Sequence, residues 1–352
     1  LLDIVVIATC AIICGADDWT DIELFGTCKE VWFRTFLPLP NGIPSHDTFG
    51  RVFARLDPAQ FRECFLRWIK AVSTLTPGQV ISIDGKTLRG SQDGTLGKNA
   101  IHMISAWASA NSLVLGQRKV DSKTNEITAI PELLQALAID GCTVTVDAMG
   151  CQKDIAQTIV DKGGDYVLAV KDNQPNLRQD ISLLFDDLDK SGPLSYVHDR
   201  AETVEKGHGR IETRRCCVIA DPTVVGALPA AVGWAGLRCV VRVQAERQTK
   251  TETTSSVRYY ISSRVDSAAA LLAVTRTHWR IENSVHWVLD IAFREDENRV
   301  RKDNGAENFA ILRHIALNLL KQDKTVKVGV KGKRLKAGWD ESYLLHLLSA
   351  LS

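Results

Sequence analysis

Residues 79–90 read QVISIDGKTLRG, and residues 143–150 read TVTVDAMG. In each stretch a short apolar run typical of a β-strand ends at an aspartate, Asp84 in the first and Asp147 in the second. Ligands of open α/β sheets bind beyond the carboxyl ends of the strands, so both carboxylates occupy positions where chemistry is expected. The alternative is that each aspartate only caps a turn, as Asp at a strand end often does.

The sequence around the two aspartates alternates between strand and helix patterns. Strands are predicted at 80–83, 101–108, 113–120, 144–146 and 166–170, and helices at 131–139, 152–161 and 175–188. The order β-β-β-α-β-α-β-α is the one that a ribonuclease-H-like mixed sheet requires, with the aspartates after its first and fourth strands. Three more strand patterns follow, at 211–219, 237–244 and 257–262. They predict a β-rich insertion at about 195–265, before helical periodicity resumes at Ala268.

The two ends of the chain have a different character. Residues 1–76 show only helical periodicity, with helix starts predicted at Ser45 and at Asp57, where Pro58 takes the first helical position. A helix is predicted at 306–320, followed by seven basic residues against one acid between Lys321 and Lys336. We therefore predict a helical N-terminal domain (1–76), a catalytic domain (77–320), and a basic C-terminal segment with a terminal helix (321–352).

The composition is that of a folded globular protein of about two domains, with 352 residues, 45% hydrophobic and 24% charged. A net charge of +1 means that a polyanionic partner must be held by local basic patches. Nine scattered cysteines without a zinc-ribbon spacing favour a reducing, cytoplasmic setting. The apolar run Ile4–Cys14 is too short to cross a membrane and predicts a buried helix. Because the chain opens at Leu1 inside that pattern, we expect a short preceding segment.

Carboxylates at two strand ends suit divalent cations such as Mg²⁺, which prefer oxygen ligands. A third carboxylate is needed, and Glu282 in HWRIENSVHWVLD is the best candidate, on the helix that returns after the insertion. His278, Glu282 and His286 are spaced by four residues, so a zinc site on this helix is an alternative. A single helix cannot bring all three side chains to one ion, which disfavours it.

Several motifs together resemble the H-repeat-associated group of DDE insertion-sequence transposases. They are IDGKTLRGS (83–91), KTNEITAIPELL (123–134), VDAMGCQ (146–152), KGGDYVLAVKDNQP (162–175), GHGRIETR (207–214), HWRIENSVHWVLD (278–290) and FREDENRVR (293–301). The resemblance extends to the N-terminal region and covers nearly the whole chain. It implies a ribonuclease-H-like core in which Asp84, Asp147 and Glu282 bind Mg²⁺, or Mn²⁺ in its place, and cut and join DNA at the ends of the element.

The resemblance also implies the partners. These are double-stranded DNA, as terminal inverted repeats and as target, and a second copy in a homodimeric active complex associated with the nucleoid. Broader relatives carry Arg four residues before the glutamate and Lys seven after it, but this chain has His278 and Leu289 there. We therefore consider His278, Arg280 or His286 for those phosphate contacts.

Further DNA contacts are predicted from basic or polar residues near the acids, in the insertion and in the C-terminal segment. The candidates are Lys86, Arg89, Lys171, Asn173, Gln174, His208, Arg210, His278, Arg280, Lys331, Lys333 and Arg334. Solvated loops, a simple glycine turn at 208–210 and a solvated C-terminal tail are the alternatives. Glu126 is a possible supplementary metal ligand or a loop acid bonded to the backbone.

Two other functions stay open at this point. A decayed or domesticated transposase copy would bind DNA without cutting it, although the retention of all three carboxylates argues against this. A stand-alone metal nuclease would cut unrelated duplexes equally well and give no joined product.

Overall fold

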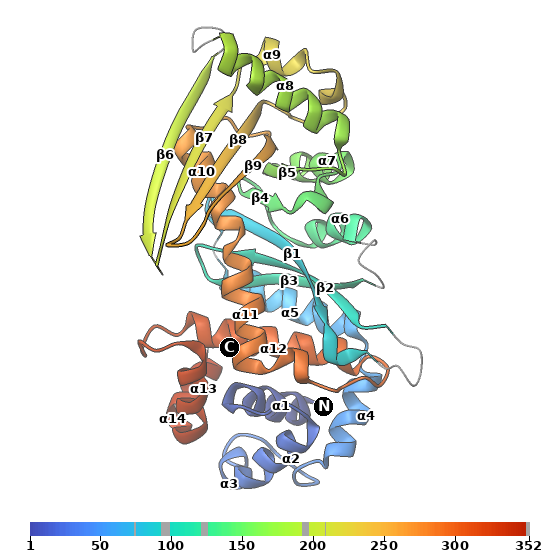
Figure 1. Ribbon diagram of the computed structural model, residues 1–352. Coiled ribbons are helices and arrows are strands. Elements are labelled where there is room, and N and C mark those ends of the chain that lie inside the picture. The colour runs from blue at the N-terminus through green and yellow to red at the C-terminus, as the bar shows by residue number, and fades with distance from the viewer. Residues whose placement is uncertain (74, 93–98, 121–125, 192–196, 208, 350–352) are drawn as a thin grey trace. The chain divides into compact units, whose positions relative to one another are not determined.

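The computed structural model describes residues 1–73, 75–92, 99–120, 126–191, 197–207 and 209–349. The chain divides into two compact units (Figure 1). Unit 1 comprises Leu1–Thr74, Gly85–Asn125 and Ile281–Ser352, and unit 2 comprises Leu75–Asp84 and Glu126–Arg280. Strand β1 (Val80–Leu88) carries the chain from unit 2 into unit 1, immediately after Asp84.

Unit 1 is built around one long helix, α12 (Gly305–Gln322), in which every residue from Gly305 to Leu320 is buried. Such an all-round burial requires partners on every side. Around it lie α1 (Leu2–Cys14), α2 (Trp19–Cys28), α3 (Glu30–Phe33), α4 (His46–Arg55), α5 (Pro58–Val72), β2 (Ile101–Ala108), β3 (Leu113–Val120), α11 (Trp287–Phe293), α13 (Val330–Trp339) and α14 (Glu341–Leu348). Helix α12 contacts α1, α4, α5, α13 and strand β3 (Figure 1). Because the N-terminal helices and the C-terminal segment pack around the same helix, they belong to one unit. The division of the sequence into three domains stays a prediction.

The N-terminal helix signals are confirmed. Ser45 precedes α4, and Asp57 caps α5 by accepting a hydrogen bond from the amide of Ala59 at 2.8 Å. Pro58 takes the first helical position, where its missing N–H costs nothing. The apolar run near the N-terminus forms the buried helix α1. In the described part of the chain, no helix is long and apolar enough to cross a membrane.

Unit 2 pairs an α/β core with a long antiparallel extension. Its elements are the start of β1, α6 (Glu126–Ala136), β4 (Thr143–Val146), α7 (Lys153–Asp161), β5 (Asp165–Val170), α8 (Pro175–Ser191), β6 (His198–Gly207), β7 (Arg210–Ile219), α9 (Pro222–Gly226), β8 (Cys239–Gln248), β9 (Thr253–Ser262) and α10 (Ala268–His278). One apolar cluster joins α10 to the strands of the extension through Leu271 and Leu272, against Cys216, Val241 and Val243. Helix α10 thus lies against the extension (Figure 1).

The described strands hydrogen-bond in the order β3-β2-β1-β4-β5-β9-β8-β7-β6, a mixed sheet of nine strands. Strands β1, β4 and β5 are parallel, and their register places Ile83 beside Val146 and Val146 beside Leu168. Strand β2 pairs with β3, and β5, β9, β8, β7 and β6 pair in turn; all of these pairs are antiparallel. The order of strands and helices predicted for the α/β region is confirmed.

Three elements differ from the prediction. Strand β6 was not expected, because its side chains are mostly exposed and it forms by backbone pairing with β7 along its whole length. Helix α6 begins at Glu126 and not at Pro131, since its first turn buries Ala129 and Ile130. The basic segment after α12 contains a helix, α13.

Candidate active site

Asp84 and Asp147 follow paired residues of neighbouring parallel strands. Pairing of β1 with β4 ends at Ile83 and Val146, and the aspartates are the next residue on each strand. Both are half-buried. Strand β1 continues to Leu88, so Asp84 lies where the pairing with β4 ends and not where the strand ends. Parallel strands place equivalent residues at one edge, so unit 2 brings these two carboxylates to the same position in its sheet.

Asp147 also caps the short turn η3 (Ala148–Gly150). Its Oδ1 accepts hydrogen bonds from the amides of Met149 at 3.1 Å and Gly150 at 3.3 Å. The turn is tight, because a Cβ on Gly150 would lie 2.2 Å from a methyl carbon of Val146. Capping uses one carboxylate oxygen, which leaves the other able to bind a cation. The capping alternative and the metal-ligand prediction are therefore compatible.

The surroundings of Asp147 favour uptake of positive charge. Burial and the nearby carboxylate of Glu126 raise the pKa of Asp147, against two backbone hydrogen bonds and Lys171. Glu126 is itself buried in the first turn of α6. Two carboxylates this close repel one another, and a cation at Asp147 would relieve that repulsion. The role of Glu126 as a supplementary metal ligand stays a prediction.

Asn173 and Gln174 support the loop that follows Asp147. The Asn173 side-chain amide donates to the carbonyl of Ala148 at 2.6 Å, and that of Gln174 donates to the carbonyl of Cys151 at 2.9 Å. These bonds connect the end of β5 to the turn after β4. Lys171, at the same strand end, is exposed. Both amides therefore have a structural partner, and their predicted contact with DNA remains a prediction.

Glu282 begins a π-helical turn, Glu282–His286, in unit 1. Such turns interrupt α-helices frequently at functional sites. The Glu282 side chain is about half exposed, and its Oε2 lies 3.5 Å from Nδ1 of buried His286. In unit 2, His278 instead contacts the hydroxyl of Thr145 at 3.1 Å. The two histidines have different partners, so the three-residue zinc alternative on this helix gains no support.

Lys86 does not lie free on the surface, as the prediction of a DNA contact required. Its Nζ lies 2.7 Å from Asp290, 2.9 Å from Glu295 and 3.1 Å from Asp296, and its side chain is only 11% exposed. Burial opposes the charge, yet Glu295 and Asp290 hold the pKa of Lys86 above its ordinary value. We call these four residues the Lys86 cluster. Sequence reasoning missed the cluster, although the acidic run in FREDENRVR was a visible signal.

Three more of the side chains predicted to contact DNA are buried and have partners inside the protein. Burial lowers the pKa of His278 to about 4, so it carries no charge for a phosphate. The Lys333 ammonium donates to the carbonyl of Leu320 at 2.8 Å and pairs with Asp323. The Arg334 guanidinium donates to the carbonyls of Ile12 and Ala292. The basic segment therefore turns part of its charge inward to hold unit 1 together.

The other predicted DNA contacts have varied surroundings. Arg210 forms an ion pair with Glu212 at 2.5 Å, and Arg89 is 82% exposed, with Asp296 at 3.6 Å. Arg280 and Lys331 are exposed. His208 lies outside the described residues. Arg89, Lys171, Arg280 and Lys331 thus keep the accessibility that a phosphate contact requires.

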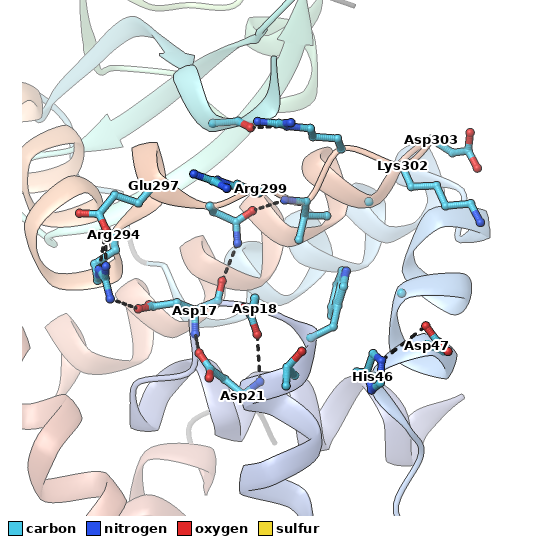
Figure 2. A pocket seen from close by; sticks show the side chains of 18 of the residues that line it. Asp17, Asp18, Asp21, His46, Asp47, Arg294, Glu297, Arg299, Lys302 and Asp303 are labelled. Carbon is cyan, nitrogen blue, oxygen red and sulfur yellow. Dashed lines mark hydrogen bonds and ion pairs between the residues drawn. The ribbon is translucent and has the colours of Figure 1, made fainter. Parts of the chain in front are cut away.

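A large open groove of about 1430 Å³ lies in unit 1, and Figure 2 shows its walls. One wall carries Asp17, Asp18 and Asp21, and the other carries Arg294, Arg299 and Lys302. The acids are used internally: Asp18 caps α2 and Asp21 accepts the amide of Asp17. Neither Asp84, Asp147 nor Glu282 lines the groove, and its mixed charge does not suit a polyanion.

Comparison with known proteins shows the family of the chain. Residues 1–69 match the family described as DDE_Tnp_1-associated, and residues 75–319 match the Transposase DDE domain. The chain belongs to the DDE transposase family. This transposase is 43% identical to the H repeat-associated putative transposase YhhI of Escherichia coli K12, over 99% of this chain and 92% of that one.

A second relative and one solved structure are also similar to this chain. The putative transposase YncI of Escherichia coli O157:H7 is 42% identical, over 100% of this chain and 90% of that one. Among solved structures, a piggyBac transposase synaptic complex with hairpin DNA aligns with 99% of this chain and 71% of that chain. That alignment has a TM-score of 0.43 and 11% identity.

The donor set fits a hard divalent cation. Asp84 and Asp147 offer carboxylate oxygens at one sheet edge, and burial together with the nearby Glu126 carboxylate raises the pKa of Asp147. Mg²⁺ and Mn²⁺ are bound by such oxygens in phosphoryl-transfer sites.

Proposed function

We propose that this transposase cuts and joins the DNA ends of an insertion sequence, with Asp84, Asp147 and Glu282 as the ligands of its divalent cations. The observation that carries the proposal is the register of β1 with β4, which puts Asp84 and Asp147 on equivalent positions of neighbouring strands. Two features support Glu282 as the third ligand: its place in the family motif, and its accessible side chain in a π-helical turn.

Asp84, Asp147 and Glu282 would hold divalent cations, which would supply activation of the attacking water or 3′-hydroxyl and stabilisation of the leaving oxygen of the phosphodiester. The protein's part is to fix the three carboxylates. Asp147 is held by its two backbone hydrogen bonds, and its turn is held by Asn173 and Gln174. The proposed reaction requires metal ligands from the protein and no covalent protein nucleophile. Three carboxylates are therefore sufficient for it.

The partner is double-stranded DNA, as terminal repeats and as target, and we propose a homodimer in the active complex. Contacts to phosphate come from exposed basic side chains, namely Arg89, Lys171 and Arg280. Lys331 is a further candidate. Phosphate contacts provide affinity and position, and the carboxylates serve the reaction. Action on DNA places the protein at the nucleoid of the cytoplasm.

The test is cleavage of a duplex carrying the element's own ends, with Asp84→Asn, Asp147→Asn and Glu282→Gln as variants. Each should lower the cleavage rate about 1000-fold, which corresponds to about 4 kcal/mol of transition-state stabilisation. Binding of the same duplex should stay close to wild type, because phosphate contacts carry affinity. Asp154→Asn, in an exposed acid of α7, is the matched control and should cut normally. Normal cutting by any of the three test variants would remove that residue from the site.

The product distinguishes the rival functions. A transposase gives cut ends that join to a second duplex, whereas a general nuclease cuts unrelated duplexes equally well and joins none. A decayed copy binds the ends and cuts nothing in Mg²⁺ or Mn²⁺. Joined product from wild type, absent in Glu282→Gln, would favour the transposase over both.

The ion itself is a second test. An oxygen-only site should work with Mg²⁺ and Mn²⁺, and should bind Ca²⁺ with little cutting because of its longer bonds and looser geometry. His286 lies 3.5 Å from Glu282, so the imidazole is the specific rival ligand. Zn²⁺-driven cleavage that disappears in His286→Ala would overturn the oxygen-only assignment. Equal Mg²⁺ activity in wild type and His286→Ala would support it.

A further inference from the structure

The Lys86 cluster connects the strand that bears Asp84 to the helix that bears Glu282. Lys86 follows Asp84 by two residues on β1, and Asp290 lies two helical turns after Glu282. Glu295 and Asp296 lie in the turn that ends this helix. All four charged groups of the cluster lie in unit 1. We call the helical segment from Glu282 to Phe293 the glutamate helix. One ammonium therefore fixes both the end of this helix and the turn beyond it.

The cluster is buried and is braced from behind. Glu295 is buried, and its second oxygen lies 3.6 Å from the guanidinium of Arg313, which is also buried. The Arg313 guanidinium in turn lies over the ring of Phe309, 4.4 Å from its centroid. Both of these residues belong to α12, the central helix of unit 1. The end of the glutamate helix is thus tied to the rigid core of the unit as well as to β1.

A direct DNA contact by Lys86 does not fit this environment. Three carboxylates surround one ammonium, so the immediate charge is negative and repels a phosphate. Removing the ammonium would leave buried Glu295 with less compensation, which is strongly unfavourable. What Lys86 can do is hold these carboxylates, and the segment that carries them, in one place.

We propose that Lys86 is a positioning residue of the metal site, which holds the glutamate helix against the unit 1 part of β1 and thereby fixes the position of the Glu282 carboxylate. The inference rests on the proposed function, because it takes Glu282 and Asp84 as ligands. Groups outside the ligand shell that orient ligands commonly change metal affinity about 10- to 100-fold when mutated. Lys86 would act at this level through Asp290 and Glu295.

The experiment measures Mn²⁺ binding to the full chain by electron paramagnetic resonance, beside thermal melting and end cleavage. Lys86→Met should weaken Mn²⁺ binding about 10-fold or more, and Lys86→Arg should restore part of it because the charge is kept. Lys333→Met is the matched control: it removes another buried lysine of unit 1, paired with Asp323 at 3.3 Å. It should lower the melting temperature and leave Mn²⁺ affinity at the wild-type value.

Asp290→Asn keeps the test decisive if Lys86→Met does not fold, since it removes one partner and leaves the ammonium with two. It should also weaken Mn²⁺ binding. Combined with Lys86→Met it should add little further loss, because both changes break one connection. Losses that multiply in the double variant would show that Lys86 acts independently of the cluster.

Failure of this inference and failure of the proposed function give different results. Wild-type Mn²⁺ affinity in Lys86→Met and Asp290→Asn, with affinity lost in Glu282→Gln, overturns the positioning role alone. Loss of DNA binding by Lys86→Met with unchanged Mn²⁺ affinity overturns it in favour of a direct contact. Mn²⁺ binding that is unaffected by Glu282→Gln and Asp84→Asn would overturn the proposed metal site itself.

Discussion

His278 shows how burial changes the role of a single residue. Sequence spacing made it a candidate for contact with phosphate, but its ring is buried beside Thr145 and burial lowers its pKa to about 4. An imidazole that stays neutral in the folded protein contributes packing and a hydrogen bond, not charge. The unfolded chain would protonate the same ring at a pKa of about 6.5.

This difference predicts a loss of stability in acid. Because the folded pKa lies below the unfolded one, the unfolded state binds more protons, and stability falls as the pH drops from about 6.5 toward 4. The loss attributable to His278 reaches about 3 kcal/mol, at about 1.4 kcal/mol for each pKa unit. In His278→Asn, which cannot protonate, melting temperature should fall less steeply over this range than in wild type.

The control is His46→Asn. Its hydrogen bond to Glu23 raises the pKa of His46, so the linkage has the opposite sign, and its contribution is lost as the pH rises. His46→Asn should not protect against acid. Identical acid profiles for wild type and His278→Asn would show that the ring is not kept neutral.

At the scale of elements, the turn η1 (Arg89–Ser91) packs closely on the chain after the glutamate helix. A Cβ on Gly90 would lie 2.0 Å from the carbonyl oxygen of Asn298, and Arg301 donates to the carbonyl of Gly90. Gly90→Ala should therefore push these segments apart and lower stability by about 1–3 kcal/mol. Gly226→Ala, where a Cβ meets nothing within 4 Å, should be close to neutral. Equal melting temperatures for both variants would contradict the close packing.

Helix α13 gives a second prediction at this scale. The Arg334 guanidinium binds the carbonyl of Ile12 and lies 4.2 Å from the centroid of the Phe293 ring. Arg334→Met should cost about 3 kcal/mol of stability, since the charged hydrogen bonds of the guanidinium to buried carbonyls are lost. End-DNA affinity, measured below the melting temperature, should not change. Lower affinity for the end DNA with an unchanged melting temperature would indicate that Arg334 contacts DNA directly.

Exposed Lys331 on the same helix is the matched case. If it touches phosphate, Lys331→Met weakens binding to all sequences and reduces the slope of affinity against salt by about one. An unchanged salt slope would exclude it from the interface.

The elements that the sequence predicts best are those with strong local signals. Strands β2 and β3 lie where the short β-rich runs of the sequence predict them, and α5 begins at its Asp57–Pro58 signal. Strand β6 was missed because pairing with β7, not apolar periodicity, forms it. Local pattern describes what a segment can do alone, and an exposed edge strand depends on its neighbour.

At the scale of the whole molecule, the sequence likewise predicts one part of the candidate site and not the other. The aspartates could be located because each follows a recognisable strand. The partners of Lys86 could not, because Glu295 lies 209 positions further along the chain and no local pattern relates the two. The inward-facing charges of Lys333 and Arg334 were missed for the same reason: their partners at Leu320 and Ile12 are set by packing within unit 1.

The central claim is that three carboxylates bind the ions with which this transposase cuts DNA. The most direct measurement is Mn²⁺-dependent cleavage of a duplex bearing the element's ends, by wild type, Asp84→Asn, Asp147→Asn and Glu282→Gln, with Mn²⁺ binding followed on the same samples. We expect wild type to bind Mn²⁺ and cut, and each variant to retain duplex binding while losing cleavage and part of its Mn²⁺ affinity. Wild-type cleavage by all three variants, or cleavage that persists in a chelator, would contradict the claim.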